Sequence, residues 1–140
     1  MAGHPLVIGS SSILISVSEH TYGAPKTLEP QFPELESLRA LPHLELAVSL
    51  DLSFEVQQAE WRKRITANDG RSLILRGGWL EGAVTQVAIT CLIEGLDVFI
   101  AADACDTREA DYRDWFLKRL YSYGATISTT RQLAMELRTD

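Results

Sequence analysis

The stretch Leu73-Ile74-Leu75-Arg76-Gly77-Gly78-Trp79-Leu80-Glu81-Gly82-Ala83-Val84-Thr85-Gln86 decides the fold of this 140-residue chain. It predicts an apolar strand, a turn with two glycines, and a helix whose apolar face begins at Ala83. In an open α/β sheet, such a junction places the first turn of the helix at the carboxyl ends of the strands, where ligands bind. The residue expected there carries only a methyl group.

Strand and helix patterns alternate along the rest of the chain. Strands are expected at 13–18, 44–49, 72–76, 97–102 and 125–128, and helices at 57–67, 81–94, 109–123 and from 129 or 130 to 137. Parallel strands joined by crossover helices give this alternation. The sequence therefore predicts one α/β domain over residues 1–140, with a doubly wound, mainly parallel sheet in three layers.

Two helices carry large apolar side chains at helical spacing. We expect Trp61 and Ile65 to face the core from one helix, and a larger set to be buried by another. That set is Tyr112, Trp115, Phe116, Leu120 and Tyr123.

The charge of the chain argues against nucleic acid as a partner. There are 13 basic and 19 acidic residues, the net charge is −6, and the basic residues are scattered apart from Arg62-Lys63-Arg64, which fits a solvated helix face. No apolar run approaches the roughly 18 residues that span a membrane. We expect a soluble protein without a membrane or nucleic acid partner.

The cysteines and histidines show no metal-ligand spacing. Cys91 lies in a helix pattern and is expected in the core, whereas Cys105 lies in a loop and is the thiol expected to be exposed. His4, His20 and His43 share no ligand spacing either. We expect no metal, no cofactor, and a reduced, cytoplasmic protein.

Several segments resemble the isochorismatase-like cysteine hydrolases, the superfamily of isochorismatase, nicotinamidase and N-carbamoylsarcosine amidohydrolase. They are 77–86, Glu94-Gly95-Leu96-Asp97-Val98 with Ala102-Asp103-Ala104, and Gly124-Ala125 with Ile127-Ser128-Thr129. Val17-Ser18-Glu19-His20 and Leu52-Ser53-Phe54 are similar to a branch of small uncharacterised hydrolases. The resemblance runs from about Leu6 to Leu137 and implies the fold predicted above.

The resemblance also implies a catalytic triad of aspartate, lysine and cysteine, and none of the three is found. The cysteine position falls on Ala83, and the lysine position falls on Ser49, with Asp51 two residues further on. The aspartate ends the family's first strand, and we expect this chain to begin after that strand. Because an alkyl side chain has no lone pair to donate, we expect the family's covalent chemistry to be absent.

Other polar residues fall near the expected carboxyl ends of the strands. A Ser-His-acid arrangement can be drawn from Glu19, His20, Ser49, Asp51 and Glu81. The alternative is that the carboxylates stabilise loops or helix amino-termini and that the histidine is a loop hydrogen-bonder. Trp79, Leu80 and Ala83 complete the candidate pocket, with Trp79 and Leu80 at a place where the family often has a cis peptide bond.

The family's sheet has six parallel strands with the first in the middle, whereas this chain supplies five. The segment 6–8 cannot replace the first strand, because 9–12 is too short for a parallel crossover. Three alternatives stay open: the sheet closes over the gap, a partner chain contributes the strand, or the natural protein is longer.

The resemblance implies a catalytically inactive family member that acts as a homo-oligomeric or small-molecule-binding scaffold. The alternative is a divergent hydrolase of amide, carbamoyl or isochorismate-like substrates that uses other pocket residues or is completed by an absent segment.

Overall fold

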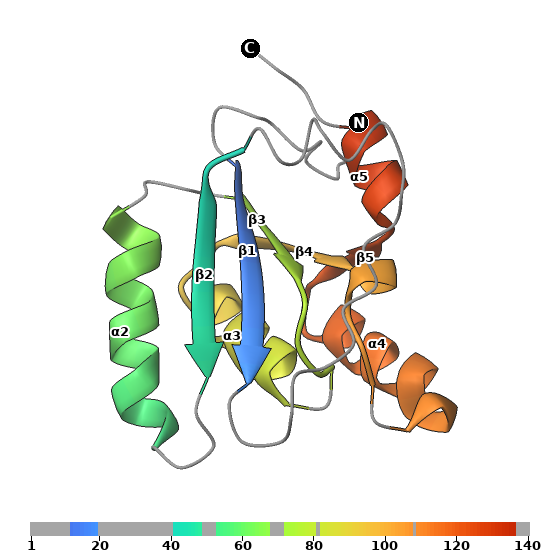
Figure 1. Cartoon of the computed structure of the whole chain (residues 1–140), viewed down its shortest axis with the longest axis horizontal. Helices are drawn as coiled ribbons and strands as arrows, with labels where there is room; N and C mark the ends of the chain where they lie inside the picture. The colour runs from blue at the N-terminus through green and yellow to red at the C-terminus, as the bar shows by residue number, and fades with distance from the viewer. Residues whose placement is uncertain are drawn as a thin grey trace.

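The computed structural model describes residues 12–19, 41–48, 53–67, 72–80, 82–107 and 109–136. Within them, a five-stranded sheet carries helices on both faces (Figure 1). The strands are β1 (Ser12–Glu19), β2 (His43–Val48), β3 (Ser72–Arg76), β4 (Asp97–Ala101) and β5 (Thr126–Ser128). The helices are α2 (Phe54–Ala67), α3 (Ala83–Ile93), α4 (Arg113–Ser122) and α5 (Thr130–Glu136), with short 3-10 helices η2 (Ala102–Ala104) and η3 (Ala110–Tyr112).

All neighbouring strands run parallel, in the order β2-β1-β3-β4-β5. The predicted α/β class, the five strands and the parallel sheet are therefore confirmed. No helix in the described ranges has the length and apolarity needed to cross a bilayer.

The sheet has no gap between β1 and β3, although the resemblance implies a further strand in the middle of the sheet. β1 pairs directly with β3, with Ser12 opposite Ser72 and Ser16 opposite Arg76, and β2 pairs with the other edge of β1. The described strands thus agree with the first of the three alternatives, in which the sheet closes over the gap. Pairing the two edges satisfies backbone groups that would each cost about 1 to 3 kcal/mol if buried alone.

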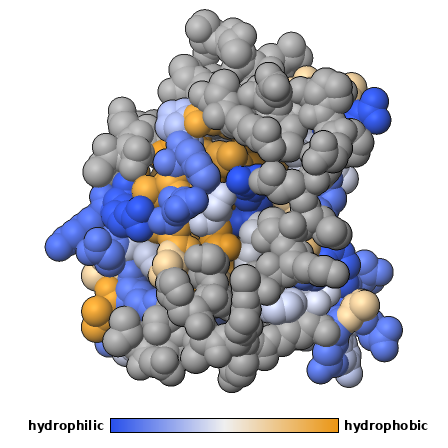
Figure 2. All heavy atoms as spheres, in the orientation of Figure 1, coloured by the Kyte–Doolittle hydropathy of each residue, from blue (hydrophilic) through white to orange (hydrophobic). Residues whose placement is uncertain are grey.

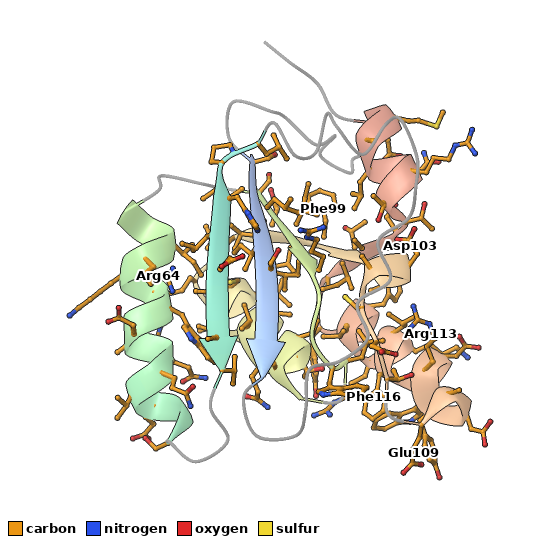
Figure 3. All side chains as sticks on the ribbon, viewed as in Figure 1. Arg64, Phe99, Asp103, Glu109, Arg113 and Phe116 are labelled. Carbon is orange, nitrogen blue, oxygen red and sulfur yellow. The ribbon has the colours of Figure 1, made fainter. Side chains whose placement is uncertain are left out.

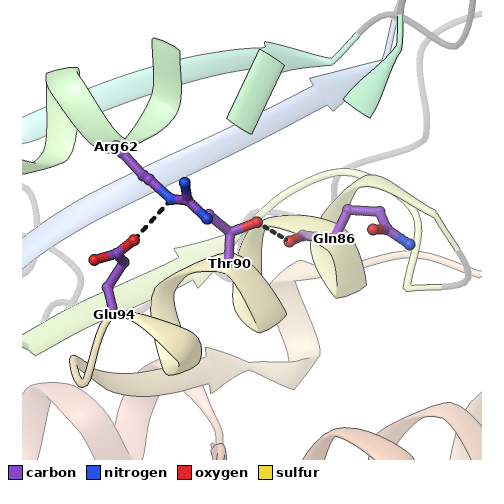
Figure 4. Close-up of polar contacts among 4 residues, drawn as sticks. All are labelled: Arg62, Gln86, Thr90 and Glu94. Carbon is purple, nitrogen blue, oxygen red and sulfur yellow. Dashed lines mark hydrogen bonds and ion pairs between the residues drawn. The ribbon is translucent and has the colours of Figure 1, made fainter. Parts of the chain in front are cut away.

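The two faces of the sheet differ in what covers them. One face packs its branched side chains against α2, α3 and α4, and Trp61 and Ile65 are buried there as expected. An ion pair between Arg62 and Glu94, 2.7 Å long and half exposed, lies where α2 meets α3 (Figure 4). The main core therefore lies on this side.

The opposite face has a smaller apolar cluster and an open part. Leu14, Ile74 and Phe99 pack with Leu133 of α5 near one end. On β2 every second residue is exposed, beginning with His43, so hydrophilic atoms lie beside hydrophobic ones on the face shown in Figure 2.

One prediction about the core is wrong. Leu120 is fully buried and Phe116 half-buried, but Tyr112, Trp115 and Tyr123 are 53%, 56% and 49% exposed. The helical spacing of the five residues is as expected, but the side of α4 that packs against the sheet is too narrow to bury all five side chains. The helix therefore presents aromatic side chains to solvent.

The turn after β3 needs glycine because it passes close to β1. Gly77 and Gly78 have φ values of +79° and +68°. A Cβ on Gly77 would lie 2.8 Å from the carbonyl oxygen of Val17. The turn is also hydrogen-bonded to the chain after β4, with Gly77 N–H donating to the Ala104 carbonyl at 2.7 Å.

We predict that Gly77→Ala lowers the free energy of unfolding by about 3 kcal/mol or more, because it adds a backbone clash to left-handed strain. Gly95→Ala is the matched control, since Gly95 has φ +80° with nothing within 4 Å of an added Cβ. It should cost only about 1 to 2 kcal/mol. Urea unfolding of the two variants measures the difference, and equal losses would contradict the close approach of the glycine turn to β1.

Candidate functional site

The candidate site begins where the glycine turn enters α3. Ala83 is the first residue of the helix and its side chain is completely buried. The N–H groups of Gly82 and Val84 donate to the Trp79 carbonyl at 3.1 and 3.2 Å, and the Thr85 hydroxyl donates to the Leu80 carbonyl. The helix start is thus packed and hydrogen-bonded to its own turn, with a methyl group where the resemblance puts the nucleophile.

The polar side chains after β4 hold the backbone in place. The Asp103 carboxylate accepts hydrogen bonds from both the N–H and the hydroxyl of Thr130, each 2.8 Å long, and so caps α5. The Arg113 guanidinium donates to the Cys105 carbonyl at 3.1 Å and to the Ala102 carbonyl. Figure 3 labels the Asp103 and Arg113 side chains. These groups join the β4 end of the sheet to α4 and α5.

Neither described cysteine is a poised nucleophile. Cys91 is buried as expected, and burial, with the negative charge of Glu94, raises the pKa of its thiol to about 12. The expectation that Cys105 is exposed is wrong: the residue is 6% exposed, because its loop is drawn against the turn through a bridge between Trp79 and Asp106. Burial raises the pKa of its thiol to about 12, although Arg113 acts in the opposite direction.

Much of the predicted pocket lies outside the described residues. This holds for His20, Ser49, Asp51 and Glu81. The structure gives the backbone of Glu19 as the end of β1, next to Val48 of β2. Trp79, Leu80 and Ala83 lie together in the turn and helix start, and the Trp79–Leu80 peptide bond is trans. The proposed Ser-His-acid arrangement stays a prediction.

The structure brings together a different serine and histidine, which the sequence reasoning missed. Ser16 Oγ of β1 lies 2.7 Å from His43 Nε2 of β2, and Arg76 Nε of β3 donates to the same oxygen at 2.9 Å. A polar Ser16 within an apolar strand was a usable signal. Its partners could not be found without knowing that β1 lies between β2 and β3.

Ser16 is hydrogen-bonded to the strands on both of its sides. Arg76 Nε donates to one of the two lone pairs of the Ser16 oxygen. Where His43 Nε2 is unprotonated it accepts the Ser16 proton, and in the other tautomer Nε2–H donates to the second lone pair of Ser16. In both cases guanidinium, hydroxyl and imidazole form one hydrogen-bonded row. This row ties the three strands together across the closed position in the sheet.

Within the ranges that the structure covers, no three His, Cys, Asp or Glu side chains gather to hold a metal ion.

The sequence model of one protein family, described as "Isochorismatase domain", matches residues 57–132, more than half of the chain. Isochorismatase domain-containing protein 2 of Xenopus laevis is 29% identical over 116 residues, which are 83% of this chain and 54% of that protein. The protein of the same name from Bos taurus is 30% identical over 113 residues, or 81% and 52%. The chain thus spans about half the length of these relatives.

Solved structures share the fold at low sequence identity. The YcaC gene product of Escherichia coli, described as an octameric hydrolase of unknown specificity, has a TM-score of 0.79 at 18% identity, covering 98% of this chain and 84% of that one. YcaC from Pseudomonas aeruginosa gives 0.78 at 16% identity, covering 98% and 85%.

We predict that neither Cys91 nor Cys105 reacts with a disulfide reagent at pH 8 while the protein is folded, because a thiol with a pKa of about 12 holds its proton there. Both should react within the dead time in urea. The unfolded thiols ionise near 9.0, so their contribution to stability should be complete below pH 9 and lost as the pH rises toward 12. A thiol that titrates at once in native protein would show that one of the two is accessible.

Proposed function

The chain belongs to the isochorismatase family, and from this premise we propose that it is a catalytically inactive member that acts as an oligomeric or small-molecule-binding scaffold. The observation that carries the proposal is Ala83, a buried methyl group at the head of α3. Covalent catalysis needs a nucleophile with a lone pair, and this position has none.

The two cysteines support the proposal because they do not replace the missing thiolate. Both are buried, and both have raised pKa values. The residue expected at the lysine position is Ser49, which has no positive charge to stabilise a developing anion. Open α/β sheets bind ligands at the carboxyl ends of their strands, and this does not require a nucleophile, so binding without turnover is compatible with the fold.

The proposed partner is another copy of the chain. The E. coli structural neighbour is described as an octamer, which favours a homo-oligomer here as well. The net charge of −6 argues against a nucleic acid partner. We place the protein in the cytoplasm, where its free thiols would stay reduced.

We predict no turnover of amide, carbamoyl or isochorismate-like substrates by the purified chain. Ala83→Cys should remain inactive, because the other two catalytic groups are not restored. Ala88→Cys, at another completely buried alanine of α3, controls for the added sulfur. Turnover by the unmodified chain that disappears in Ser49→Ala or Glu19→Gln would overturn the proposal.

Ligand-dependent rises in melting temperature across a library of small amides and carboxylates would identify bound molecules.

The second candidate function is a divergent hydrolase, favoured by the contact between Ser16 and His43. A nucleophile and a base within 2.6 to 3.2 Å are the usual sign of an activated serine, and Arg76 offers positive charge at the same oxygen. In this alternative, Ser16 Oγ attacks an acyl carbon while its proton passes to His43 Nε2. The imidazolium then protonates the amine or alcohol that leaves as its bond to the acyl carbon breaks, and water hydrolyses the acyl-serine to a carboxylic acid and free Ser16.

A fluorophosphonate probe separates the two candidates. The scaffold proposal predicts that the probe does not label the native protein above the level of Ser16→Ala. Labelling mapped by mass spectrometry to Ser16, and reduced at least about 100-fold in His43→Gln, would instead establish the hydrolase. Ser12→Ala is the matched control, since Ser12 lies on the same face of β1.

A further inference from the structure

The exposed side of α4 has the composition of a protein interface. Tyr112, at the end of η3, Trp115 of α4 and Tyr123, which follows α4, are about half exposed. They are three and eight residues apart, and both spacings are close to whole turns of about 3.6 residues, so the three side chains share one side of the helical stretch. Tyr, Trp and Arg are the residues that most often dominate binding at interfaces. Single exposed apolar residues need no explanation, but a continuous aromatic stripe does.

The stripe continues into an apolar groove on the neighbouring helix. The groove has a volume of about 390 Å³ and is lined by Ile89, Leu92 and Ile93 of α3 together with Tyr123. Ile93 is 71% exposed. The stripe and the groove, defined by Tyr112, Trp115, Tyr123, Ile89, Leu92 and Ile93, are called the α4 surface below.

An arginine that contacts the α4 surface, Arg119, is already held in place. The Arg119 guanidinium lies 5.8 Å from the centre of the Trp115 ring and 5.4 Å from that of Tyr123, and its Nε donates to the Tyr123 hydroxyl at 3.1 Å. A side chain that is ordered before binding loses less conformational entropy when a partner arrives.

The charges beside the α4 surface are divided between its two halves. Asp111 and Asp114 are exposed near the amino end, and Lys118 and Arg119 are exposed near the carboxyl end. Two such helices packed antiparallel about a two-fold axis place the acidic half of each opposite the basic half of the other. Parallel packing would instead set like charges side by side.

We propose that the α4 surface binds a second copy of this chain, with the two α4 helices antiparallel and Trp115 next to the two-fold axis. The proposal rests on the oligomeric form of the function proposed above and names its interface. Asp114 of each copy then lies near Lys118 of the other, and Tyr112 near Arg119.

The size of the α4 surface fits such a dimer. Tyr112, Trp115, Tyr123 and Ile93 together present about 400 to 500 Å² of apolar area, since a fully buried aromatic side chain covers 150 to 250 Å². A stable interface buries about 800 Å² on each partner, of which a little over half is apolar. The exposed apolar area therefore matches what one copy must contribute.

Light scattering on a sizing column, across a range of protein concentrations, tests the proposal. We expect the unmodified chain to contain an even number of copies and Trp115→Glu to have at most half that mass. Tyr121→Glu is the matched control: Tyr121 is 70% exposed on the same helix but lies away from the stripe, so this variant should keep the full mass. Circular dichroism and a thermal melt check that each variant is folded.

A charge exchange tests the antiparallel arrangement. Asp114→Lys and Lys118→Asp should each weaken association about tenfold, and the double variant should restore it, because opposite charges again face each other. Loss of mass in both single variants without rescue would overturn the antiparallel arrangement. An oligomer unaffected by Trp115→Glu would overturn the α4 surface but leave the oligomeric scaffold standing. A monomer at every concentration would overturn both the α4 surface and the oligomeric scaffold. The small-molecule-binding scaffold would then be tested by the melting-temperature experiment.

Discussion

The direct hydrogen bonding of β1 to β3 is the constraint on which the rest of the structure depends. It joins the two halves of the sheet, sets Ser16 in the same row as Arg76, and brings Val17 close enough to the glycine turn that a side chain at Gly77 has no room. The turn in turn fixes the start of α3 and receives the loop after β4. A change in the pairing of β1 with β3 would therefore move the glycine turn, the start of α3 and the row of Ser16 and Arg76.

The architecture could be predicted from the sequence because the periodicity of apolar residues indicates strands and helices, and glycine and proline indicate where they end. All five strands lie within one or two residues of their expected bounds, and Gly95 follows α3 as expected. Periodicity was less reliable for burial. It shows which side chains share a face of α4, but whether Trp115 meets the core or the solvent depends on how closely neighbouring elements approach, which no local pattern contains.

The candidate site could be predicted only in part, for a related reason. Ala83 was located correctly at the head of a helix, because a strand-turn-helix junction is local. The row of Ser16, His43 and Arg76 joins residues up to 60 positions apart and depends on strand order. Cys105 was misjudged because a loop was equated with exposure, whereas this loop is drawn inward by hydrogen bonds to the turn.

The cap that Asp103 provides for α5 has a consequence for how the molecule opens. One carboxylate oxygen of Asp103 accepts hydrogen bonds from both polar groups of Thr130, so α5 is attached to the segment that directly follows β4, an inner strand of the sheet. Leu133 of the same helix is buried beside Phe99 of that strand. If α5 unfolded alone, it would expose the apolar cluster around Leu133 and remove the hydrogen bonds that the Asp103 carboxylate accepts. The helix and the strand should thus open as one cooperative unit, with amide protons that exchange at a common rate.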